Sequence, residues 1–146
     1  MKKQDYTATF SVKANAKDVF KTINSVKKWW SEDLKGHSEK LNDVFTVSFG
    51  ETWITLQIVE FIQNEKTIWL VTDCHKHWLK DKKEWKGTKI IWELSKEKKE
   101  TTIHFSHLGL LPGMECYKGC ERAWDSYLKE SMVQLINKGI GSPELK

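Results

Sequence analysis

The alternation of apolar and polar residues predicts β-strands over much of the chain. Residues 6–12 alternate, and Phe45, Val47 and Phe49 share one face of a later strand. The alternation changes phase near Val59, which predicts a β-bulge there. Short polar turns separate the further strands that we expect over residues 54–62, 67–74, 86–95 and 101–108.

The residues after the first strand predict two short helices. Asn15 offers a side-chain cap, and Val19 and Ile23 begin an apolar stripe at helical spacing. Ser25 is expected to restart the chain into a second short helix over residues 26–30. The sequence therefore predicts a helical elbow between the first strand and the rest of the sheet.

One long helix is predicted from about residue 115 to residue 138. Gly139 and Gly141 are typical stop signals, and Pro143 follows them. At 100° per residue, an apolar stripe with two small or polar members falls within about 100° of the helix circumference. Its members are Tyr117, Cys120, Trp124, Tyr127, Leu128, Ser131 and Leu135.

This order of elements predicts an α+β fold. An antiparallel sheet with one buried face needs a cover, and a helix of roughly 22 residues is about 33 Å long. We expect a curved antiparallel sheet wrapped around the long C-terminal helix, in a single domain over residues 1–146 with a core at about 4–141. The space between sheet and helix is the candidate site.

Composition and cysteine content indicate the class of protein and the compartment in which it is expected. The chain is 39% hydrophobic and 30% charged, which is typical of neither disorder nor a membrane span. Residues 1–5 do not begin an apolar signal segment. Three cysteines are an odd number, which favours reduced thiols over a disulfide framework. A cytoplasmic protein without a membrane span is expected.

The positive charge is concentrated in one segment. The net charge is +4, and residues 76–100 hold nine lysines against five acidic residues. Arg122 is the only arginine, and acidic residues are interleaved with the lysines. Because nucleic-acid sites favour clustered basic groups with arginine forks, no nucleic-acid partner is expected. A solvated hairpin is the preferred interpretation.

Several local strings, in this order and spacing, resemble a known superfamily over residues 4–141. The chain resembles the Bet v 1-like, START-like (SRPBCC) proteins with their helix-grip fold, in the branch similar to the C-terminal domain of the activator of Hsp90 ATPase. The strings are Asp18–Asn24, Val26–Ser31, Thr67–Trp69, Glu84–Thr88, Ile103–Leu110, Glu115–Tyr117, Cys120, Ala123–Trp124 and Tyr127–Ser131.

The resemblance implies a helix-grip fold and a ligand cavity. Members bind apolar or amphipathic small molecules under the long helix, and some are cyclases, aromatases or hydrolytic enzymes. The chaperone activators use the same fold for contact with a protein. We therefore expect binding of an apolar or amphipathic small molecule, without catalysis.

The sequence also suggests which residues would contact that molecule. Eight tryptophans are more than a small core requires, which favours an aromatic-lined pocket, with a solid aromatic core as the alternative. His107, Tyr127 or Ser131 would orient the ligand. The predicted ligand-binding residues are Trp30, Phe45, Val47, Leu56, Ile58, Trp92, Phe105, His107, Trp124, Tyr127, Leu128 and Ser131.

Two other functions are kept as alternatives. His107 could serve as a base in a small enzyme. The lysine-rich segment 76–100, with exposed tryptophans at Trp78 or Trp85, could instead contact a chaperone. A homodimer is a further possibility, because residues 67–74 are apolar on both faces and their inward face cannot be assigned.

Two cysteines near the start of the long helix raise the question of a metal. Cys116 and Cys120 have helical i, i+4 spacing, and His75 and His77 could add two ligands. The sequence contains no CxxC or HExxH motif. Small residues that allow close helix packing are the preferred interpretation, so no metal or other cofactor is expected, and the role of the two thiols stays open.

Overall fold

Apart from a short additional strand at residues 34–36, the strands and helices come in the predicted order along the chain. The computed structural model describes residues 6–77, 80, 82–97, 99–110 and 117–138. Its elements are β1 (Tyr6–Val12), α1 (Ala16–Asn24), α2 (Val26–Trp29), β2 (Leu34–Gly36), β3 (Val44–Phe49), β4 (Thr52–Ile62), β5 (Lys66–His75), β6 (Lys89–Glu97), β7 (Glu100–Leu108), α3 (Tyr117–Asp125), the π-helical turn η1 (Ser126–Met132) and α4 (Val133–Lys138).

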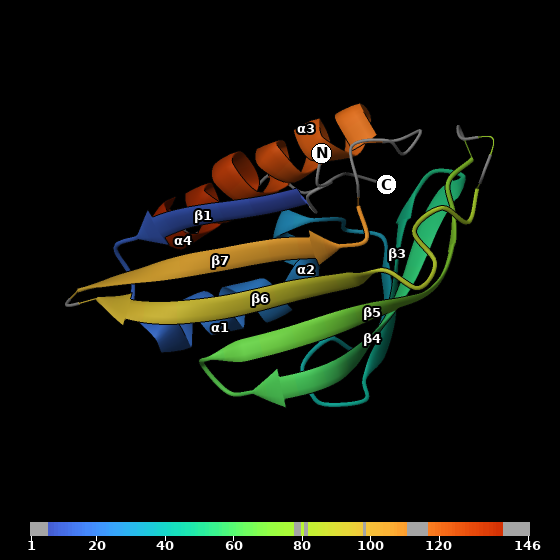
Figure 1. The fold of residues 1–146 in the computed structure, drawn as a ribbon. Helices are drawn as coiled ribbons and strands as arrows, with labels where there is room; N and C mark the ends of the chain where they lie inside the picture. Colours follow the sequence, from blue (N-terminus) through green and yellow to red (C-terminus); the bar gives the residue numbers. More distant parts are fainter. Residues whose placement is uncertain (1–5, 78–79, 81, 98, 111–116, 139–146) are drawn as a thin grey trace, which may run out of the picture.

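All seven strands form one antiparallel sheet. The strand order is β1-β7-β6-β5-β4-β3-β2, so β1 and β2 lie at opposite edges. The chain crosses from one edge to the other through α1 and α2, which lie behind the curved sheet in Figure 1. The hydroxyl of Ser131 in η1 donates to the Trp29 carbonyl at 2.8 Å. The short helices and the C-terminal helix therefore pack against each other on the same side of the sheet.

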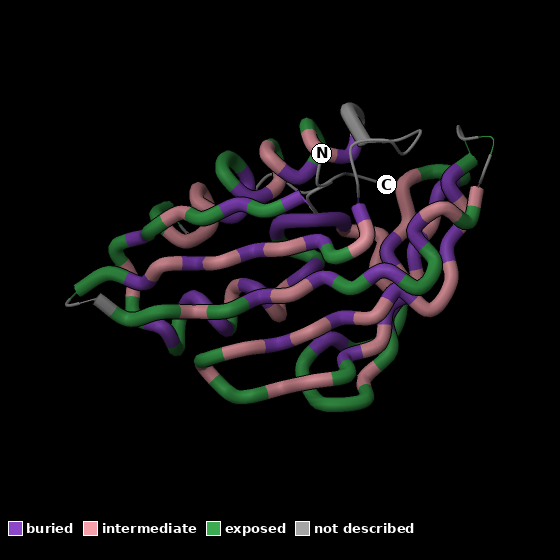
Figure 2. Tube along the Cα trace, in the orientation of Figure 1, coloured by how far each residue is buried: buried purple, intermediate pink, exposed green. Residues whose placement is uncertain are grey.

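Burial alternates along the strands as the sequence pattern predicts. In β7, Thr101, Ile103, Phe105 and His107 are buried, and the residues between them are more exposed. Figure 2 shows the same alternation along β1 and β6. Because successive side chains point to opposite faces of a strand, the concave face collects the apolar set that the helices cover.

The predicted bulge near Val59 is confirmed. Ile58 pairs with Trp69 and Glu60 pairs with Ile68, so Val59 is the extra residue in β4. The exposed Val59 side chain interrupts the alternation that the preceding residues of β4 follow.

A second irregularity inserts Thr72 into β5. Leu56 pairs with Val71 and its neighbour Thr55 pairs with Asp73, which leaves Thr72 unmatched. The inward face of β5 consequently changes from odd to even positions. Before the irregularity Trp69 and Val71 are buried, and after it Cys74 and Lys76 are buried. This assigns the inward face that the apolar pattern leaves open.

Local hydrogen bonds set the limits of α1. The Asn15 side chain accepts a hydrogen bond from the Asp18 backbone N–H at 2.8 Å, which is the expected N-cap. At the other end, the backbone N–H of Ser25 bonds to the Lys21 and Thr22 carbonyls, and α2 begins directly afterwards. The elbow brings Trp29 and Trp30 over the sheet.

The C-terminal helical segment contains a π-helical turn. Trp124, Leu128 and Met132 are all buried along one line of this segment. A regular 100° step rotates Met132 away from the predicted stripe, whereas the wider π turn brings it back toward the core. The predicted start at residues 115–116 lies outside the described residues.

Gly36 allows β2 and β3 to approach closely. Its φ is +96°, and a Cβ atom placed there would lie 2.2 Å from the Val44 carbonyl oxygen. Only glycine accepts this conformation and this contact without strain. The sequence pattern did not predict β2 as a separate strand.

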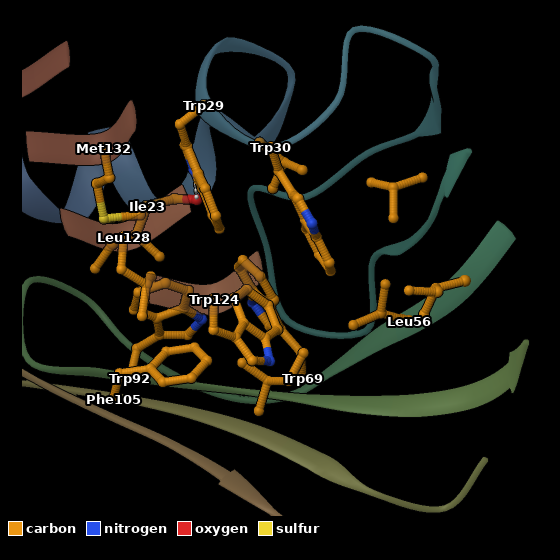
Figure 3. Packing of buried hydrophobic residues seen from close by; sticks show 14 of the residues in the cluster. Ile23, Trp29, Trp30, Leu56, Trp69, Trp92, Phe105, Trp124, Leu128 and Met132 are labelled. Atoms are coloured by element: carbon orange, nitrogen blue, oxygen red, sulfur yellow. Dashed lines mark hydrogen bonds between the residues drawn. The ribbon is translucent and has the colours of Figure 1, made fainter. Parts of the chain in front are cut away.

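Aromatic side chains fill the middle of the interior. Trp69 lies 5.4 Å from Trp92 and 5.2 Å from Phe45 between ring centroids, and Trp92 lies 4.8 Å from Phe105. Figure 3 shows Trp29 reaching from the helical elbow toward these rings of the sheet. Within the described ranges, no helix has the length and apolar character needed to cross a bilayer.

Candidate functional site

A cavity of about 270 Å³ lies at one end of the interior, beyond the packed rings. It is bounded by the end of β3, the beginning of β4, the segment after β5 and the first half of the C-terminal helix. We call it the Lys76 cavity. Its walls are Trp30, Phe49, Thr52, Ile54, Lys76, Trp85, Cys120, Ala123, Trp124 and Tyr127.

Five of the ten cavity-wall residues are aromatic. The centroids of Trp30 and Trp124 lie 5.1 Å apart, and the rings of Trp85 and Trp124 are near parallel at 5.9 Å. The ring centroid of Phe49 lies 6.1 Å from that of Trp30 and 6.3 Å from that of Tyr127. Flat apolar faces on several sides favour a guest that is itself flat or apolar.

Lys76 brings a charge to this wall. Its side chain is 6% exposed, and Nζ lies 3.9 Å from the centroid of the Trp85 ring. A cation over an indole face gains electrostatic stabilisation that offsets part of the cost of burial. The prediction of a solvated lysine segment is wrong for this residue, because the irregularity at Thr72 turns position 76 inward.

Trp85 is buried as well, which corrects the prediction that it is exposed. Only 4% of its surface is accessible, and its ring meets His107 edge-on with centroids 4.4 Å apart. Trp78, the other tryptophan proposed for protein contact, lies outside the described residues. Trp85 belongs to the interior because the chain between β5 and β6 folds back over the end of the sheet.

His107 organises this end of the core through both ring nitrogens. The Trp124 indole N–H donates to Nδ1 at 3.1 Å, so Nδ1 carries no proton. The proton therefore lies on Nε2, which donates to the Thr88 hydroxyl at 2.8 Å. That hydroxyl donates in turn to the Trp85 carbonyl at 2.6 Å. The chain of bonds fixes Trp85 and Trp124 relative to each other.

The surroundings of His107 keep its ring neutral. Burial, and to a smaller extent the positive charge of Lys76, lower the pKa of His107 to about 3. An imidazole that is uncharged at neutral pH, with its lone pair already occupied, suits a structural role. The predicted alternative of His107 as a base gains no support from this geometry.

The structure brings three of the twelve predicted ligand-binding residues to the cavity wall, namely Trp30, Trp124 and Tyr127. The other nine lie within the packed interior instead, because neighbouring rings and aliphatic groups fill the space beside them. These nine are Phe45, Val47, Leu56, Ile58, Trp92, Phe105, His107, Leu128 and Ser131. The cavity is therefore smaller, and nearer to one end of the sheet, than the sequence predicts.

Seven wall residues were absent from the predicted set. Phe49 and Ile54 follow the inward parity of their strands, and Cys120 lies on the predicted helical stripe, so the sequence contained a signal for these three. Lys76 becomes an inward residue only through an irregularity in β5 that the apolar pattern did not predict. Thr52 shares the parity of Ile54 but precedes the strand predicted over residues 54–62, and for Trp85 and Ala123 the sequence offers no comparable signal.

The thiols and histidines are distributed over separate sites. Cys120 is a buried cysteine in the cavity wall, whereas Cys116 lies outside the described residues. His77 Nε2 contacts the Glu51 carboxylate at 2.9 Å on the surface. Among the residues that the structure describes, no three His, Cys, Asp or Glu side chains are arranged to hold a metal ion.

Comparison with known proteins finds likeness in structure. No family model matches the chain, and no curated protein matches its sequence. The Aha1 dimer from Colwellia psychrerythraea superposes with a TM-score of 0.77 at 18% identity, over 94% of this chain and 99% of that one. A Staphylococcus saprophyticus protein gives 0.73 at 11% identity, over 97% and 98%.

A third structure, CalU16 from Micromonospora echinospora, gives a TM-score of 0.66 at 11% identity over 93% of this chain and 77% of that one. The chain shares their fold. The fold is a curved antiparallel sheet covered by a C-terminal helix. The structural comparison therefore supports the fold that the sequence resemblance implied. At these identities the likeness does not extend to activity.

Proposed function

We propose that the protein binds a small apolar or amphipathic molecule in the Lys76 cavity, without transforming it. The observation that carries this proposal is the aromatic cavity beside an otherwise filled interior. Its volume of about 270 Å³ is near the lower end of the roughly 300–1,000 Å³ typical of small-molecule sites. A guest of one or two fused rings suits this space better than a long acyl chain.

The wall supports such binding through apolar burial. Burying apolar surface contributes on the order of 25 cal/mol per Å² before the cost of ordering the guest. The walls already have defined positions, because His107 and Thr88 hold two of the tryptophans. A wall fixed before binding reduces the entropy lost when the guest enters.

A binding role also fits the state of His107 better than base catalysis does. Its Nδ1 atom accepts from Trp124, and its low pKa leaves the ring a weak proton acceptor at neutral pH. The polar groups that reach the cavity, Lys76, Thr52 and Tyr127, are suited to orienting a guest.

Blocking the mouth of the cavity tests the proposal. Ala123 is exposed and lines the cavity, so Ala123→Trp would place an indole at the entrance. Ser126→Trp is the matched control, because Ser126 is exposed on the same helical segment but is outside the cavity wall. Isothermal titration with one- and two-ring aromatic acids, amides and alcohols should show binding to the wild type and the control, and loss of binding in Ala123→Trp.

The proposal fails if no compound of this panel binds the wild type at millimolar concentration. It also fails if Ala123→Trp, folded by circular dichroism, binds as tightly as Ser126→Trp. Either result would mean that the cavity does not receive the guest.

Homodimerisation with chaperone contact is the second proposal, because one structure of the same fold is described as an Aha1 dimer. The burial of Trp85 removes one tryptophan on which the chaperone interpretation depended. Sedimentation equilibrium would test the dimer, and a monomer at 100 µM would contradict it. Stimulation of a bacterial Hsp90 ATPase would test the chaperone contact, and an unchanged rate would contradict it.

A further inference from the structure

The position of Lys76 indicates a chemical class for the guest. The residue follows β5, and the irregularity at Thr72 turns it toward the cavity. Its backbone N–H bonds to the Lys82 carbonyl at 2.9 Å, which anchors the chain where it leaves the strand. Its Nζ atom lies 3.9 Å from the ring centroid of Trp85, which places the ammonium group beside another wall residue.

Lys76 is the charged side chain among the described residues of the cavity wall. Within the part of the chain that the structure describes, no aspartate or glutamate is among the wall residues. The pKa of His107 is lowered partly by the charge of Lys76, which is consistent with a field that is weakly screened in this part of the interior. The attraction between an anionic group and this ammonium group is stronger in such a space than at an exposed surface, because water screens it less.

Trp85 contributes to the same arrangement. The Nζ atom of Lys76 lies over the Trp85 ring. That ring is nearly parallel to the ring of Trp124, which also lines the cavity. A flat guest that contacts Trp30 or Trp124 with its ring would have its edge near the ammonium group, since Trp30, Trp85, Trp124 and Lys76 line one cavity. The wall thus offers aromatic surface and one cation together.

We propose that the guest is an aromatic or similarly flat apolar molecule with a single anionic group, such as a carboxylate, and that Lys76 Nζ binds this group. The inference rests on the proposed binding function and specifies its ligand class. Aromatic rings hold the apolar part, and the carboxylate accepts hydrogen bonds from the ammonium group. A neutral or cationic analogue of the same shape binds more weakly because it lacks this ion pair.

Three probes of equal ring size separate charge from shape. They are 2-naphthoate, 2-naphthamide and 2-naphthylmethylammonium, measured by isothermal titration against the wild type. We expect 2-naphthoate to bind about tenfold or more tightly than the amide, in line with a hydrogen bond to a charged group. The ammonium probe should bind most weakly, since it meets Lys76 with the same charge.

Lys76→Met keeps the length of the side chain and removes its charge. This variant should bind 2-naphthoate and 2-naphthamide within about twofold of each other. Lys86→Met is the matched control, because Lys86 is exposed, lies in the same connection and is outside the cavity wall. It should keep the wild-type preference. If Lys76→Met does not fold, Lys76→Gln provides the same test with a polar side chain.

The outcomes distinguish the two proposals. Equal affinity for acid and amide in the wild type, lost in Ala123→Trp, would overturn the anion proposal and leave the binding function standing. A preference for the acid that survives in Lys76→Met would also overturn it. If none of the three probes binds the wild type, both proposals are wrong for guests of this size.

Discussion

The middle of the interior and its Lys76 end both contain buried tryptophans, but the tryptophans pack differently in the two regions. In the middle, Trp29, Trp69 and Trp92 are fully buried and contact further rings on several sides. At the Lys76 end, Trp124 also contacts Trp30 and Trp85, yet these three rings line a cavity of about 270 Å³. The number of tryptophans therefore does not decide whether the space under the helix is filled.

Hydrogen bonding marks the difference between the two regions. The indole N–H groups of Trp69 and Trp92 have no acceptor among the described residues. The N–H of Trp124 instead donates to His107, within a chain of bonds that reaches Trp85. Ring packing holds Trp69 and Trp92 in the middle, whereas a chain of hydrogen bonds fixes Trp85 and Trp124 in the cavity wall. Substitutions in the middle and in the cavity wall should therefore have different effects on stability and binding.

Truncating a ring in the middle should have the largest effect on stability. Trp69→Ala removes a side chain that contacts Trp30, Phe45 and Trp92, and such changes cost about 3–5 kcal/mol of unfolding free energy. Urea denaturation monitored by circular dichroism measures the loss. A cost below about 1 kcal/mol would mean that the middle of the interior is not tightly packed.

Acid should destabilise the protein through His107. Its folded pKa of about 3 is below the ordinary value of 6.5, so the unfolded chain binds the extra proton first as pH falls. The stability it contributes is complete above pH 6.5 and decreases toward pH 3, by up to about 1.4 kcal/mol per pH unit. Between pH 6.5 and pH 4.5 the loss is therefore about 2 kcal/mol.

A pair of variants isolates this contribution from that of other groups. The Lys83 ammonium lowers the pKa of Asp73, and protonation of that carboxyl also destabilises the fold in acid. His107→Gln should make the pH dependence shallower, whereas His104→Gln, on the opposite face of β7, should not. Denaturation curves at pH 4.5 and pH 6.5 decide this, and equal slopes in both variants would contradict the assignment.

Removing the Thr88 hydroxyl should have a smaller effect. Thr88→Val leaves the buried Nε2–H of His107 without its acceptor, which costs about 1–2 kcal/mol. Thr9→Val is the control at an exposed position of β1 and should change stability by less than about 0.5 kcal/mol. Denaturation of both variants measures the difference, and equal stabilities would show that the bond contributes nothing.

Truncating the cavity wall should affect stability least and binding most. Phe49 is partly buried, so Phe49→Ala is expected to cost about 1 kcal/mol, less than Trp69→Ala. Because the ring lines the cavity and contacts Trp30 and Tyr127 in its wall, its loss should weaken 2-naphthoate binding several-fold. Titration of the variant measures the loss of binding, and denaturation of the same preparation measures the loss of stability. Unchanged binding would contradict the assignment of Phe49 to the site.

The periodic parts of the sequence predicted most of the fold. The inward positions of β7, the Asn15 cap and the long C-terminal helix follow from local rules that tertiary contacts do not change here. The bulge at Val59 was also visible as a change of phase. These features depend on residues close together in the sequence, which is why a single sequence contains them.

The cavity depends on two departures from periodicity. The extra Thr72 in β5 exchanges the inward and outward positions after it, so the lysine at position 76 becomes a wall residue. The π turn similarly moves Met132 into the core. Neither follows from residue type alone. Which tryptophans fill the interior and which leave space depends on three-dimensional packing between distant strands.

The most direct test uses the tryptophans as reporters. Proton–nitrogen NMR resolves indole N–H groups, and single Trp→Phe variants assign them. On titration with 2-naphthoate, we expect the largest shifts at Trp30 and Trp85 in the cavity wall, and the smallest at Trp29 and Trp92 in the packed middle. Larger shifts at Trp29 and Trp92, or no shift at any indole at saturating probe, would contradict a guest site at the Lys76 end.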